Sequence, residues 1–199
     1  MHLKEALQWW WGDVRHPMGL ILFVYALLCG RTFGYVDTLV PILVAASVAG
    51  AVDLAIIRFR TGGWAFPSSG LVTGSIVGLV TAYQTPLWFV ALIAFIAVVS
   101  KVVIQWRGKH YFNPANFGML IGIYLLGANT TWWGASAADL GSAGLLAILL
   151  GGIFVVHRMR RWWIVLPFLI AFFGLRAAYY IFTGAPAGML DELVQEILR

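Results

Sequence analysis

Charged residues are scarce in this chain of 199 residues, and acidic ones are fewer than basic ones. Only 11% of the residues are charged, 61% are hydrophobic, and the mean hydropathy is +0.87. Soluble domains carry about a quarter charged residues, so a water-soluble fold could not bury this much apolar surface. The composition therefore predicts an all-α integral membrane protein whose apolar side chains face lipid.

Cysteine is almost missing as well, since Cys29 is the single one. One cysteine excludes an intramolecular disulfide and a CxxC metal or redox site, and we expect Cys29 to be a small packing residue. The chain also lacks HxxxH, HExxH, a carboxylate cluster, a Walker loop and a Ser, His and Asp set placed to make a nucleophile. We therefore expect neither a metal centre nor an ordinary soluble-type enzyme.

Long apolar runs are what the sequence does contain. Seven runs are predicted as membrane spans, at residues 17–31, 36–57, 69–84, 86–105, 115–128, 141–157 and 162–183. The third and fifth are short and each follows a Pro-containing polar stretch, at 66–69 and 112–116. We expect both to be half-helices that begin within the membrane and face each other across a protein-lined space.

The two ends of the chain are more polar than the region between them. Residues 1–16 are predicted as an amphipathic interfacial segment, 17–185 as the transmembrane domain, and 186–199 as a C-terminal amphipathic segment on the membrane surface.

Basic residues gather in loops that fall on one side of the membrane if the spans alternate. They are Lys4, Arg15, Arg58, Arg60, Arg107, Lys109, Arg158, Arg160 and Arg161. The positive-inside rule then places the N-terminus inside and the C-terminus outside, in an inner membrane of the prokaryotic type. Because the basic clusters lie between apolar runs, we expect the net charge of +5 to orient spans rather than to bind nucleic acid.

Few ionisable residues fall within the predicted spans, and such residues are the strongest functional markers of a membrane protein. Asp53 lies about one turn from the cytoplasmic end of its span, where it is expected to pair with Arg58 or cap a neighbouring segment, with an ion or substrate role as the alternative. Lys101 is expected to reach the cytoplasmic headgroups. Arg176 is expected to extend its charged group to the membrane surface or to form a structural ion pair. The alternative is that it neutralises an anionic ligand.

Glycines recur at every fourth residue of the two short runs, at Gly70, Gly74 and Gly78 and at Gly118 and Gly122. This spacing predicts flat faces where helix backbones approach closely. The alternative is that a flat ligand ring lies against one of these faces.

Four stretches, taken in order, resemble the NqrB and RnfD family of flavin-bearing membrane subunits of sodium-pumping NADH:quinone reductase and Rnf complexes. They are AVDL at 51–54 followed by RFR at 58–60, then SGLVTG at 69–74, GKHYFNPANFG at 108–118 and LAILLGG at 146–152. The resemblance covers about half the chain. It implies a bundle of packed and broken helices, related to urea-transporter architecture, that carries electrons through flavin and is coupled to ion movement.

In that family FMN is attached to the Thr of an outward SGAT motif, and the matching residues 133–136 read WGAS. The resemblance thus implies that Ser136 occupies the attachment position, although Trp133 replaces the first residue. Ser142 also stands where the family has a Glu. Since the family has about ten spans, the resemblance implies that a redox partner subunit or a second copy of the chain completes the fold, or that the chain is a shortened member with a simpler task.

Three functions follow as hypotheses. In flavin-associated electron transport, Ser136, Trp132 and Trp133 hold FMN or riboflavin, Asn113 and Asn116 line a central cavity, and Ser68, Ser69 and Thr73 supply hydroxyl groups. The second is a transporter or channel for a small polar solute, flavin or urea-like, whose path follows Asp53, Ser68, Ser69, Asn113 and Asn116. The third is a structural assembly subunit.

Overall fold

The computed structural model describes residue 8 and residues 10–82, 85–107, 109–129 and 142–183, and the chain divides into two units. Unit 1 comprises residues 1–137 and unit 2 comprises residues 138–199. Most described residues are helical, which confirms the all-α class.

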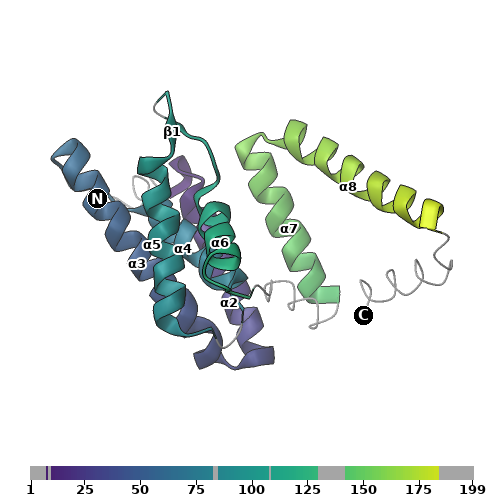
Figure 1. The fold of residues 1–199 in the computed structure, drawn as a ribbon, viewed down its shortest axis with the longest axis horizontal. Helices are drawn as coiled ribbons and strands as arrows, with labels where there is room; N and C mark the ends of the chain where they lie inside the picture. The colour runs from purple at the N-terminus through teal and green to yellow at the C-terminus, as the bar shows by residue number, and fades with distance from the viewer. Residues whose placement is uncertain (1–7, 9, 83–84, 108, 130–141, 184–199) are drawn as a thin grey trace. The chain divides into compact units, whose positions relative to one another are not determined.

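Unit 1 is a bundle whose described helices run side by side in Figure 1. They are α2 (Arg15–Phe33), α3 (Tyr35–Thr61), α4 (Ser68–Val80), α5 (Leu87–Val103) and α6 (Pro114–Tyr124). Unit 2 contains α7 (Ser142–Met159) and α8 (Trp162–Thr183). Each apolar run predicted as a span thus coincides with a helix.

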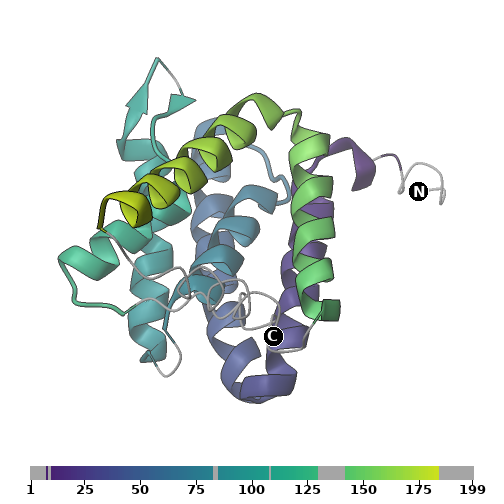
Figure 2. The ribbon, with the colours of Figure 1, turned by 90° about the vertical axis from the view of Figure 1, so that its right-hand side faces the viewer.

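A short antiparallel hairpin joins α5 to α6, and the sequence did not predict it. Strand β1 (Gln105–Trp106) pairs with β2 (Lys109–His110), and Gln105 lies opposite His110. Figure 2 shows the hairpin projecting beyond the end of α5. The pairing is confined to two residues on each strand, too few for an alternating sequence pattern to reveal.

Three described helices are long and apolar enough to cross a membrane: Arg15–Phe33, Tyr35–Thr61 and Trp162–Tyr179. Helices α4 and α6 have 13 and 11 residues, so at 1.5 Å per residue they extend only about 20 and 16 Å. A hydrocarbon core is about 30 Å thick. Both runs predicted as half-helices are therefore short helices.

A single residue, Gly34, separates α2 from α3. Its φ of +93° is a backbone conformation that favours glycine, and its N–H donates to the carbonyl of Gly30. The two helices are therefore joined by a tight turn, and α3 begins at Tyr35. Pro41 lies inside α3, six residues after its start.

The core of unit 1 is built from small residues. Ala45 and Ala49 of α3, Ala94 and Ala97 of α5, and Ala115 of α6 are buried in one cluster. Small side chains let helix backbones approach closely, which is the usual packing mode of membrane helices.

The glycine stripe of α4 packs on α3, as its spacing predicted. A Cβ at Gly70, Gly74 or Gly78 would lie 2.4–2.6 Å from backbone or Cβ atoms of α3, including the Ala45 carbonyl oxygen. A Cβ at Gly118 would lie 2.6 Å from the Cβ of Ala97 on α5. Because helices fill these faces, close packing explains the glycines and the ligand-ring alternative is wrong.

Candidate functional site

A buried ion pair links α3 to α5 at the end of unit 1 where α4 begins. The Lys101 Nζ lies 3.4 Å from the Asp53 Oδ1, and the two side chains are only 13% and 11% exposed. A buried charge without a partner is costly, so each member of this pair requires the other.

The remaining contacts of the pair come from the first turn of α4. The Gly70 N–H donates to the Asp53 Oδ2 at 2.9 Å, and Lys101 donates to the Ser69 hydroxyl at 2.8 Å. Asp53 therefore caps α4 from outside, satisfying a backbone N–H that the helix itself leaves without a partner. The prediction that Asp53 caps a neighbouring segment is confirmed.

The predicted pairing of Asp53 with Arg58 is wrong. Five residues along an α-helix turn the chain by about 140° beyond one full turn, so Arg58 points away from Asp53. Arg58 instead donates to the carbonyl of Gly62 at the end of α3 and lies over the Trp64 ring, 5.6 Å from its centroid.

The expectation that Lys101 reaches the headgroups is also wrong. Its ammonium turns inward to Asp53 and Ser69, because α5 packs against both α3 and α4 at this level. The sequence thus pointed to Lys101 but not to its contact with Asp53. The one available signal was the isolated acidic Asp53 on a neighbouring span, which needed a cationic partner of its own.

Two further residues of the predicted site have hydroxyl groups that donate within unit 1. The buried Ser68 hydroxyl donates to the Asp13 carboxylate at 3.3 Å, which ties the start of α4 to the segment before α2. The buried Thr73 hydroxyl donates to the Ser69 carbonyl at 2.7 Å. Both hydroxyl groups therefore serve the backbone and neighbouring side chains of unit 1.

Asn113 and Asn116 lie at the beginning of α6 and are both exposed. Asn113 is the N-cap, and its Oδ1 accepts from the N–H groups of Ala115 at 3.0 Å and Asn116 at 3.5 Å. The C-terminal end of α4 contacts the middle of α6, since the Thr81 hydroxyl lies 3.7 Å from the Met119 sulfur. The structure thus brings Asp53 and Ser69 together through Lys101, holds Ser68 against Asp13, and places the two asparagines elsewhere.

The residues predicted to hold flavin, Ser136, Trp132 and Trp133, lie outside the described residues, as do half of segment 1–16 and the whole of segment 186–199. Within the described part of the chain, no group of three or more His, Cys, Asp or Glu residues could hold a metal ion. Cys29 is fully buried, as expected of a packing residue.

The cluster of Asp53, Lys101, Ser69 and Gly70 holds three helices together by paired charges and a capped helix end. Its hydrogen-bond donors and acceptors already have partners within the bundle.

Comparison of the chain with protein-family models, with curated proteins and with solved structures gives no match.

Proposed function

We propose that the chain is an RnfD/NqrB-like membrane subunit for flavin-associated electron transport. In this proposal it resides in a prokaryotic inner membrane with its N-terminus inside, works with a redox partner subunit or a second copy of itself, and is coupled to ion movement. The apolar helices and the basic residues at one end of unit 1 support membrane residence.

One contact carries the family part of the proposal. The stretches at 51–54 and 69–74, which both resemble the family, meet through the hydrogen bond from the Gly70 N–H to Asp53. The third stretch supplies the N-cap Asn113 and the packing residue Gly118. These stretches are far apart in sequence but contribute contacts to one helical bundle, as we expect if the chain shares the architecture of the family.

The flavin part of the proposal depends on Ser136, with Trp132 and Trp133 beside it in sequence. In the proposed state its hydroxyl oxygen carries the phosphate of FMN as a phosphoester, or the loop holds FMN or riboflavin without a covalent bond. Aromatic side chains suit either state because they stack on a flat isoalloxazine ring.

The test is an absorbance spectrum and an intact mass of the purified chain, produced together with a flavin transferase. We expect flavin absorbance, and for the phosphoester a mass increase equal to FMN less one water. Ser136→Ala should remove the added mass, whereas the control Ser142→Ala should keep it. A chain that carries neither flavin absorbance nor added mass contradicts the proposal.

The solute-transport alternative has less support from the same contacts. A path between α3 and α4 would need space at the glycine stripe, but the backbone of α3 fills that face at Gly74 and Gly78. Uptake by proteoliposomes that falls with Asn116→Leu, in a protein without flavin, would favour transport instead.

A further inference from the structure

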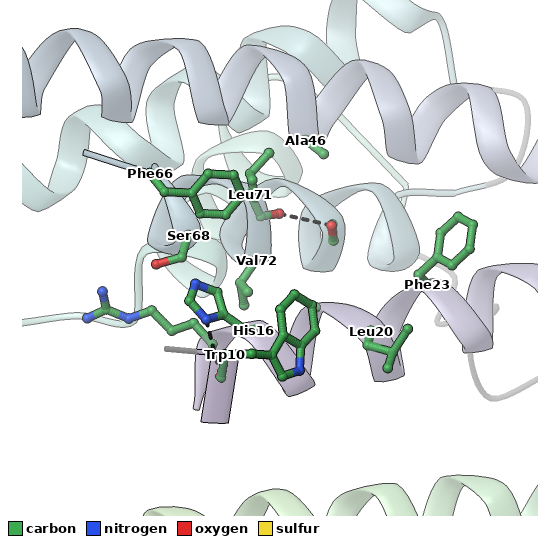
Figure 3. Close-up of a pocket in the computed structure, with 12 residues that line it drawn as sticks. Trp10, His16, Leu20, Phe23, Ala46, Phe66, Ser68, Leu71 and Val72 are labelled. Atoms are coloured by element: carbon green, nitrogen blue, oxygen red, sulfur yellow. Dashed lines mark hydrogen bonds between the residues drawn. The ribbon is translucent and has the colours of Figure 1, made fainter. Parts of the chain in front are cut away.

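A cavity of about 240 Å³ lies between α2, α3 and α4, on the outer side of unit 1 (Figure 3). Its wall is mostly apolar and includes Leu20 and Phe23 of α2 and Leu71 and Val72 of α4. Leu20 and Phe23 are each about half exposed, at 53% and 48%, so the cavity is open along α2. An opening of this kind on an apolar helix faces hydrocarbon if α2 spans the membrane.

Aromatic side chains close one end of the cavity. The rings of Trp10 and His16 stack with centroids 5.2 Å apart, and the ring of Phe66 meets His16 edge-on at 5.8 Å. The His16 Nδ1 lies 3.2 Å from the Trp10 carbonyl oxygen, which fixes the imidazole in this position. Figure 3 shows these three rings gathered at one end and Leu20 and Phe23 farther along α2. Tryptophan at such a position is typical of the headgroup level of a membrane.

Charge gathers at the same end. Arg15 lines the cavity, and its guanidinium lies 3.8 Å from the Asp13 carboxylate with half of the side chain exposed. Arg58 and Arg60 lie in the last turn of α3, which runs antiparallel to α2 and therefore ends toward the same side of unit 1. This end of unit 1 therefore attracts anions by more than one cationic side chain.

We propose that the cavity binds one anionic phospholipid, with its phosphate at Arg15 beside the aromatic end and an acyl chain along Leu20 and Phe23. The polar group at one end and the apolar groove beyond it match the two parts of such a lipid. At about 240 Å³ the cavity holds only part of one acyl chain, and the rest of the chain lies along the open side at Leu20 and Phe23.

The inference rests on membrane residence and is independent of electron transport. A chain that binds lipid but no flavin would leave it intact, and a chain with flavin but no lipid preference would overturn it alone.

The test is native mass spectrometry of the full chain in detergent micelles, with phosphatidylglycerol or phosphatidylcholine of identical acyl chains. We expect about fivefold more bound phosphatidylglycerol, the preference that one basic residue near a membrane surface confers. Arg15→Gln should remove this preference, whereas Arg60→Gln, which deletes a charge at the same end but outside the cavity wall, should keep it.

A second variant tests the groove. Gly19 lines the cavity, and a Cβ there would lie 3.9 Å from Val72 in ordinary contact, so Gly19→Leu fills space without displacing the backbone. We expect it to lower the retention of both lipids, with Gly19→Ala as the milder control. A parallel arm with inorganic phosphate should not compete with the lipid. Equal retention of the two lipids, equal loss in both arginine variants, or competition by phosphate would each overturn the proposal.

Discussion

The glycine stripe of α4 in unit 1 and the glycines of α7 and α8 in unit 2 lie in opposite surroundings. In unit 1, a Cβ at Gly74 would lie 2.4 Å from the Ala45 carbonyl oxygen, whereas in unit 2 no described atom comes within 4 Å of a Cβ at Gly152 or Gly174. Burial differs in the same direction, since 0% of the α8 window Trp162–Tyr179 is buried. The glycines of α4 are thus explained by packing within unit 1, whereas no described contact within unit 2 explains Gly152 and Gly174.

Loss of the buried Asp53–Lys101 ion pair is expected to destabilise unit 1 more than any other change proposed here. Lys101→Met leaves the Asp53 carboxylate buried without its cationic partner, so we expect the free energy of unfolding to fall by about 3–5 kcal/mol. Thermal unfolding in detergent measures the loss. The double variant Asp53→Asn with Lys101→Met should recover most of it, because asparagine keeps an acceptor for the Gly70 N–H. A single variant as stable as the parent would show that the pair contributes nothing.

Steric substitution compares the two units directly. Gly74→Leu places a side chain against the backbone of α3, and we expect a loss of about 3 kcal/mol, the upper part of the range for overpacked cores. Gly152→Leu in α7 is the matched control and should unfold at nearly the parent temperature. Equal losses at both positions would mean that α7 packs as tightly as α4.

Removal of the α6 cap should have a smaller effect. Asn113→Ala deletes the acceptor of the Ala115 and Asn116 N–H groups, which should lower stability by about 1 kcal/mol. Asn113→Asp keeps an acceptor and should retain the parent stability in the same unfolding measurement. If alanine and aspartate behave alike, the cap is not the reason for asparagine at this position.

The smallest effect is expected in unit 2 and has the opposite sign. Gly152→Ala should stabilise α7 by about 0.5–1 kcal/mol, since alanine is the better helix former and nothing described opposes its Cβ. Hydrogen exchange of the α7 amides would report the gain in the isolated chain. If Gly152→Ala instead weakens binding to a partner protein or to a second copy of the chain, the Gly152 face of α7 is a contact between proteins.

The helices of this chain could be predicted from sequence because apolar run length and glycine spacing are local properties. The capping role of Asp53 was also within reach, since a lone acid in an apolar segment needs a donor. Its partner Lys101 was not, because the two residues are 48 positions apart and only the packing of α5 on α3 brings them together. The cavity beside Trp10 and His16 escaped prediction for the same reason.

The separation between Asp53 and Lys101 has a consequence for biogenesis. A ribosome adds about 5–20 residues each second, so the 48 residues between them take roughly 2–10 s to synthesise. During that interval Asp53 of α3 has no Lys101 with which to pair. The synthesis of α5 then supplies the cation that links it to α3 through this ion pair.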